Sequence, residues 1–114
     1  METMGQRIRA LRKAAHLSQV SLAKTLGLDQ STVSDIENDK NDAFTGKVLL
    51  KMSETFSRSP FYIVYGVEGD GRHLSAEEAE LLLAFRNAHR DQKQALLTLA
   101  RALSQASGPP AAPH

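Results

Sequence analysis

Polar side chains fall on one side of residues 30–37. Val33 and Ile36 recur at helical spacing and are expected to face inward. The outward-facing set is Gln30, Ser31, Ser34 and Asp35. Amides and hydroxyls both donate and accept hydrogen bonds, so these types at this spacing suit recognition by hydrogen bonding. A glutamine amide fits adenine in the DNA major groove, and an aspartate accepts from cytosine. The alternative interpretation is ordinary solvated surface.

Catalytic chemistry finds little support in the sequence. The four histidines show no metal-ligand spacing: His16, His73, His89 and His114. The chain has no cysteine, so neither a disulfide nor a thiolate zinc site is possible. No nucleophile elbow and no phosphate-binding loop occurs. The glutamates Glu77, Glu78 and Glu80 are most simply charges at a helix start. We therefore expect no enzyme, no cofactor and no metal.

Two helices that cross steeply within residues 19–38 position the polar face. Such a crossing needs a small residue at the approach and a turn that tolerates left-handed dihedrals. Ala23 and Gly27 meet these needs, and Ser18 and Asp29 are good N-caps. The apolar underside consists of Leu22, Leu26, Leu28, Val33 and Ile36. The segment therefore predicts a helix-turn-helix.

The rest of the chain also reads as helical. We expect a helix over roughly residues 4–15, with Arg7 on its polar side. A fourth helix is expected from near Thr45, and a short fifth from Ser59-Pro60 to Gly66. The boundaries predicted from composition and caps are a domain at 1–66, a linker at 67–74, a helical hairpin at 75–104 and a disordered tail at 105–114. The fold class is therefore all-α, with no strand.

The stretch from Leu17 to Asn38 resembles the XRE-type, lambda-repressor-like helix-turn-helix family. The resemblance runs from about Gly5 to Gly66 and implies a five-helix DNA-binding domain. In this family the helix after the turn enters the major groove, and the helix before it lies across the backbone. The resemblance therefore implies a sequence-specific, double-stranded DNA-binding transcriptional regulator.

The same resemblance assigns roles to further residues. The implied phosphate contacts are Gln19, Thr32, Asn38, Lys40 and Asn41. Matching positions in the family pair across two helices, so we expect a salt bridge between Arg12 and Glu37. Two residues depart from the family's pattern: Asp35 stands where a basic or neutral residue is common, and Asp39 replaces a frequent glycine.

A broad apolar stripe follows the linker. Its members are Leu81, Leu82, Phe85, Leu96, Leu97, Leu99 and Leu103. We expect these residues to form a homodimer that binds a palindromic operator as a repressor. The alternative is that both helices fold back on the first domain. A second functional class, an antitoxin or another protein-binding adaptor, is favoured by the net charge of +1 and by Asp35, Asp39 and Asp42.

Membrane association is not expected. The sequence contains no run of about 18 apolar residues and no apolar stretch behind its N-terminus. We therefore expect a cytoplasmic protein.

Overall fold

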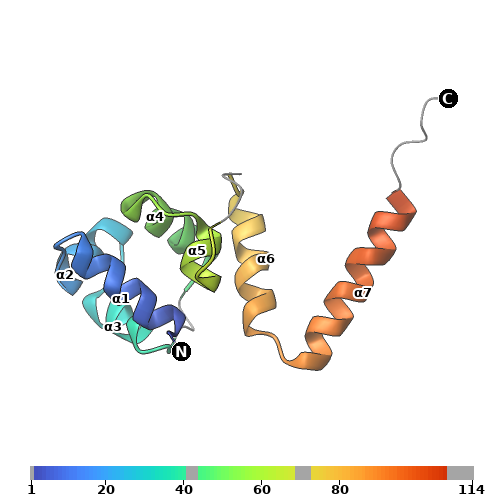
Figure 1. Ribbon diagram of the computed structural model, residues 1–114, viewed down its shortest axis with the longest axis horizontal. Helices are drawn as coiled ribbons and strands as arrows, with labels where there is room; N and C mark the ends of the chain where they lie inside the picture. The colour runs from blue at the N-terminus through green and yellow to red at the C-terminus, as the bar shows by residue number, and fades with distance from the viewer. Residues whose placement is uncertain (1, 41–43, 69–72, 108–114) are drawn as a thin grey trace. The chain divides into compact units, whose positions relative to one another are not determined.

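The computed structural model describes residues 2–40, 44–68 and 73–107, which form seven helices and no strand (Figure 1). In chain order they are α1 Met4–Ala14, α2 Gln19–Leu26, α3 Gln30–Glu37, α4 Gly46–Phe56, α5 Pro60–Tyr65, α6 Ala76–Asn87 and α7 Arg90–Ser107. The predicted all-helical class is confirmed. Four linker positions, 69–72, and tail positions 108–114 lie outside the described residues.

Local caps define several helix ends at the predicted residues. Ser18 Oγ accepts from the backbone N–H of Ser21, and Gly27 ends α2 with φ of +71°. Thr45 caps α4 in the same way by accepting from a backbone N–H. Asp29 takes the extended backbone of an N-cap but makes no side-chain capping bond. Side chains that satisfy the free amides of the first turn therefore set most of these starts.

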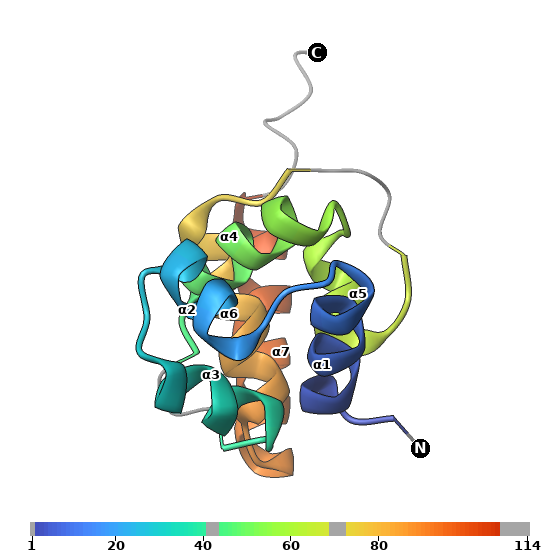
Figure 2. The same ribbon diagram turned by 90° about the vertical axis from the view of Figure 1, so that its left-hand side faces the viewer.

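The first five helices share one core. Contacts join α1 to α3 and α5, α2 to α3 and α4, and α4 to α5 (Figures 1 and 2). Ile8, Leu22, Leu49 and Ile63 are fully buried. A Cβ added at Gly5 would lie 2.5 Å from the carbonyl oxygen of Glu37. Glycine thus lets the start of α1 approach the end of α3 more closely than any larger residue would.

Arg7 differs from its predicted place on the polar side of the first helix. It is 6% exposed, and its guanidinium donates to the carbonyl oxygens of Ile63 and Val64 at 3.0 and 2.9 Å. Glu2 Oε1 accepts from the same group at 3.2 Å. The last carbonyls of a helix lack intrahelical donors, so a buried cation suits the end of α5.

The boundary between the two compact units falls after Leu83, inside α6. This differs from the predicted division into 1–66 and 75–104. Ala79 and Leu83 are buried, and Leu82 packs against the core of the first unit. A Cβ at Gly46 would lie 2.6 Å from the carbonyl oxygen of Ala76, so α4 and α6 meet backbone to backbone. Leu82 therefore contributes to the core, and Leu81 is 59% exposed.

The second unit contains the end of α6 and all of α7. The last helix begins at Arg90, one residue before the predicted Asp91, where the backbone N–H of His89 donates to the side chain of Gln92. No side chain between 90 and 105 is buried. Leu99 and Leu103 are 56% and 58% exposed.

The other predicted members of the apolar stripe, Phe85, Leu96 and Leu97, are half-buried. Within the described ranges, no helix has the length and apolar character needed to cross a membrane.

Candidate nucleic-acid interface

The polar side of α3 faces outward, because its opposite side is anchored in the core. Val33 and Ile36 are 2% and 1% exposed. Around the rest of the helix, Gln30, Ser31 and Asp35 are exposed, and Thr32 and Ser34 are half-buried. Figure 2 shows α3 beside α2 on the side of the domain that faces the viewer. The sequence-predicted base readers therefore share one helix surface.

Glu37 anchors a chain of hydrogen bonds that reaches this surface. Its Oε1 accepts from Gln19 Nε2 at 3.0 Å. Gln19 Oε1 in turn accepts from Gln30 Nε2 at 3.3 Å. Gln19 is the first residue of α2 and Gln30 the first of α3, so the starts of the two helices are joined through side chains.

The expected ion pair between Arg12 and Glu37 is present. Arg12 Nε lies 2.6 Å from Glu37 Oε2, and the side chain of Glu37 has no exposed surface. Burial of this carboxylate raises its pKa, but hydrogen bonds from Arg12, Gln19 and Arg9 and the charge of Arg12 outweigh that effect. The pKa of Glu37 therefore lies below its usual value of 4.5.

Arg9 also takes part in this hydrogen-bond network, and the sequence did not predict its role. Its Nε donates to Glu37 Oε1 at 3.3 Å and its Nη2 to Asn38 Oδ1 at 3.2 Å. The amide of Asn38 then donates to Ser34 Oγ at 3.4 Å. Arg9 lies one helical turn before Arg12, which places both on the same side of α1. That spacing is the signal that would have found it.

Asp39 contacts the start of α1. Its carboxylate accepts from Thr3 Oγ1 at 2.7 Å and from the backbone N–H of Gly5 at 2.9 Å. Its φ is +63°, in the left-handed region that aspartate tolerates. Two donors and the positive end of a helix dipole therefore compensate this charge. Asp39 no longer counts as a free acidic group on the surface.

Some of the other residues predicted to contact DNA have no partner among the described residues. The side chains of Ser31, Asp35 and Lys40 are exposed and make no hydrogen bond or ion pair with other described residues. Asn41, a predicted phosphate contact, and Asp42 lie outside the described residues. Asp35 is thus an acidic side chain of α3 that has no ion-pair partner among the residues that the structure describes.

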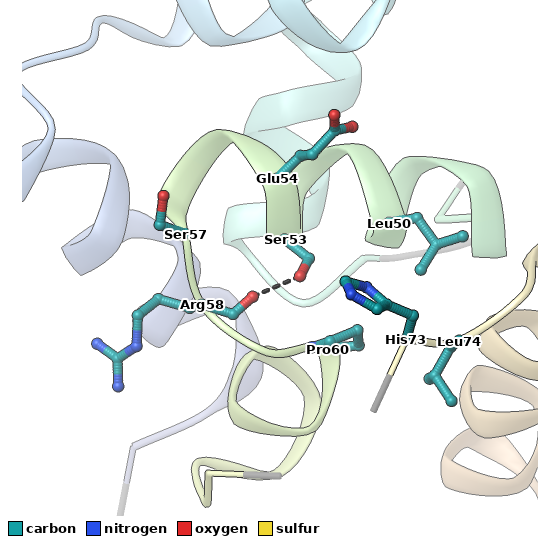
Figure 3. A pocket seen from close by; sticks show the side chains of 8 residues that line it. All are labelled: Leu50, Ser53, Glu54, Ser57, Arg58, Pro60, His73 and Leu74. Carbon is teal, nitrogen blue, oxygen red and sulfur yellow. Dashed lines mark hydrogen bonds between the residues drawn. The ribbon is translucent and has the colours of Figure 1, made fainter. Parts of the chain in front are cut away.

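A hollow on the first unit is lined by none of the residues of α3. It lies between α4, the start of α5 and residues 73–74 (Figure 3). Ser53 Oγ donates to the backbone carbonyl of Arg58 at its edge. Among the described residues, no group of three acidic, histidine or cysteine side chains is arranged to hold a metal ion.

The fold and the polar surface of α3 define a DNA-binding helix-turn-helix domain. A helix-turn-helix family model matches residues 8–63. The chain is 33% identical over 108 residues to the HTH-type transcriptional regulator DicA of Escherichia coli, covering 88% of this chain and 79% of DicA. The chain therefore belongs to the XRE-type helix-turn-helix family of transcriptional regulators.

Two further similarities cover the N-terminal part. The HTH-type transcriptional regulator PrpR of Mycobacterium tuberculosis is 41% identical over 68 residues, which are 60% of this chain and 13% of PrpR. The P22 c2 repressor in complex with a synthetic operator is 33% identical, with a TM-score of 0.55. That match covers 59% of this chain and 100% of the repressor chain.

Proposed function

We propose that the chain is a sequence-specific, double-stranded DNA-binding regulator that represses transcription by occupying an operator. The observation that carries this proposal is the exposed polar side of α3, with Gln30, Ser31 and Asp35 open to solvent above a buried apolar side. A helix enters the major groove of DNA, where amide, hydroxyl and carboxylate groups meet base edges. Ser34 completes the base-reading set.

Selection from a random duplex pool, using the full chain, tests this proposal. A defined sequence should emerge, and its affinity should fall steeply as salt rises. Gln30→Ala should relax the preference at one position per half-site, and Gln94→Ala on α7 serves as the matched control. Failure to enrich any sequence, or binding that ignores salt, would overturn the proposal.

Phosphate contacts are proposed for the residues around the reading surface. They are Gln19, Thr32, Asn38 and Lys40, with Asn41 added from the sequence alone. Such contacts hold the protein in register without reading sequence. Lys40→Ala should weaken all duplexes alike and lower the slope of log affinity against log salt by about 1. The exposed Lys51 on α4, replaced by alanine, is the control.

A homodimer on a palindromic operator is the second element of the proposal. Two copies related by a two-fold axis present two reading helices to half-sites about one helical turn apart. The proposed dimer surface consists of Leu81, Phe85, Leu96, Leu97, Leu99 and Leu103. Leu82 is left out because it packs against the core of its own domain.

Light scattering tests the dimer. Replacing Leu99 and Leu103 together with aspartate should convert a dimer into a monomer. Gln94→Asp adds the same kind of charge on the other side of α7 and should leave the dimer intact. A monomer at high concentration of the unaltered chain would rule the dimer out.

The exposed leucines of α7 also favour a second candidate function, an adaptor or antitoxin that holds a different protein on the same residues. Monomeric behaviour together with weak, nonspecific DNA binding would favour this candidate over the repressor.

A further inference from the structure

We propose that Arg9 of α1 binds a phosphate of the DNA backbone, at a point between the contacts proposed for Gln19 and Asn38. Its guanidinium is held in place by neighbouring side chains and still has charge and hydrogen-bond donors available for a ligand. This contact rests on the proposed function, because it adds one residue of α1 to the same surface.

The position of Arg9 is defined by two hydrogen bonds. Its Nε lies 3.3 Å from Glu37 Oε1, the same oxygen that lies 3.0 Å from Gln19 Nε2. Its Nη2 lies 3.2 Å from Oδ1 of Asn38, an exposed residue directly after α3. The guanidinium therefore lies between the first residue of α2 and the residue that follows α3. A phosphate that either of these residues contacts is within reach of Arg9.

The positive charge of Arg9 is only partly compensated, because its partner also pairs with another arginine. Arg12 binds both oxygens of Glu37, with Nε 2.6 Å from Oε2 and Nη2 3.1 Å from Oε1. Arg9 adds a second cation to the same carboxylate. One negative charge does not offset two positive charges. Because the side chain of Arg12 is 11% exposed and that of Arg9 is 40% exposed, the accessible part of the excess charge lies on Arg9.

Arg9 also has hydrogen-bond donors left for a ligand. A guanidinium carries five N–H groups in a planar fork. Among the described residues, partners are found for one N–H on Nε and one on Nη2, so three remain, including both on Nη1. Two N–H groups of one guanidinium can bind two oxygens of one phosphate. Glu37 and Asn38 hold the fork in place beforehand, so less side-chain freedom is lost when a phosphate binds.

These features favour a phosphate over a base edge as the ligand of Arg9. Arg9 belongs to α1, whereas the exposed polar side proposed to read bases belongs to α3. Elements of a helix-turn-helix domain other than the recognition helix mostly meet the DNA backbone. A phosphate contact raises the affinity for every duplex and carries no information about sequence.

The first test is the affinity of the full chain for duplex DNA at several salt concentrations. Arg9→Gln removes the charge but keeps an amide that can donate to Glu37. It should weaken all duplexes alike and lower the slope of log affinity against log salt by about 0.9. When salt rises about fourfold, the unaltered chain should therefore lose about 3.5-fold more affinity than this variant. Arg9→Lys keeps the charge and should keep the slope. Lys13→Gln, the same change of charge at an exposed position of α1, should leave the slope unchanged.

The second test identifies the phosphate. Single phosphates of a duplex selected from a random pool are replaced by neutral methylphosphonates, one at a time. Substitution at the phosphate bound by Arg9 should weaken the unaltered chain and have no further effect on Arg9→Gln. The same phosphate, or the next one along the strand, should lose its effect in Gln19→Ala or Asn38→Ala.

Several results would overturn this assignment. They are an undiminished salt slope in Arg9→Gln, an equal fall of the slope in Lys13→Gln, and a methylphosphonate pattern that is the same with and without Arg9. A change of base preference in Arg9→Gln would also overturn it, since Arg9 would then act on the reading surface through Asn38. Thermal melting by circular dichroism confirms folding, and Arg9→Met is the second neutral variant if Arg9→Gln does not fold.

The outcome for Arg9 is distinguishable from the outcome for the proposed function. Sequence-specific binding that persists with an undiminished salt slope in the neutral variants removes Arg9 from the surface and leaves the proposed function standing. Absence of duplex binding by the unaltered chain removes both.

Discussion

Arg12 and Glu37 form a two-point ion pair, with Nε 2.6 Å from Oε2 and Nη2 3.1 Å from Oε1. The pair joins α1 to α3 inside the domain, since the Glu37 side chain has no exposed surface and that of Arg12 is 11% exposed. A buried pair adds little net stability, but removing one partner leaves an uncompensated charge. α3, whose polar side is proposed to contact DNA, therefore depends on α1 for its placement.

Loss of the guanidinium is the direct test of this dependence. Arg12→Met should lower the free energy of unfolding by about 3–5 kcal/mol, because Glu37 keeps its buried charge. Urea unfolding measures the change. Lys13→Met, at the exposed neighbouring position, should stay within about 0.5 kcal/mol. Equal losses in the two variants would contradict a structural role for the pair.

The lowered pKa of Glu37 makes stability depend on acid. Its folded pKa lies below the usual 4.5, because donors and the charge of Arg12 outweigh the effect of burial. The carboxylate therefore adds stability that is complete above that usual value and is lost as pH falls through the folded pKa. The difference in unfolding free energy between the unaltered chain and Glu37→Gln, which cannot titrate, should shrink below pH 4.5. A difference that stays constant down to pH 2 would contradict this prediction.

Gly5 should tolerate no side chain. A Cβ there would lie 2.5 Å from the backbone oxygen of Glu37 and 2.8 Å from that of Ile36. Because backbone atoms cannot swing aside, Gly5→Ala should cost about 1–3 kcal/mol and separate α1 from α3. Gly27→Ala is the comparison, since nothing lies within 4 Å of its Cβ and only its φ of +71° opposes alanine. Thermal melting should rank Gly5→Ala as no less harmful than Gly27→Ala.

Asp39 should stabilise the start of α1. Asp39→Ala removes both acceptor bonds and leaves alanine at φ of +63°, so about 2 kcal/mol should be lost. Asp39→Asn keeps one oxygen acceptor and tolerates the left-handed backbone, so its loss should be smaller. Chemical denaturation of the two variants gives the order. A larger loss for asparagine than for alanine would refute the capping role.

Leu83 should behave as a core residue of the DNA-binding domain. It is 4% exposed, so Leu83→Ala should cost about 2–5 kcal/mol at any protein concentration. Leu81→Ala, at a site that is 59% exposed, should cost little in dilute protein. Urea unfolding at two concentrations distinguishes the residues. A Leu83→Ala variant as stable as the unaltered chain would place α6 outside the domain.

The sequence alone determined the helices and the motif. Helix ends are set by capping residues that act within one turn of the chain, so they can be predicted from neighbouring residues. These are Ser18, Gly27, Thr45 and the Ser59-Pro60 pair. Apolar periodicity then identifies which side of each helix is buried. Because caps and periodicity depend only on residues close in sequence, they predict the helices without knowledge of the fold.

Tertiary structure decided which polar groups meet. Periodicity places Arg7 on the polar side of its helix, yet the side chain is buried and donates to the carbonyl oxygens at the end of α5. The sequence predicts Asp39 to be a free charge, whereas in the structure its carboxylate accepts a hydrogen bond from the start of α1. The chain from Glu37 through Gln19 to Gln30 joins residues of two helices, so only their crossing brings it together. Such contacts depend on packing between segments distant in sequence, which no local pattern encodes.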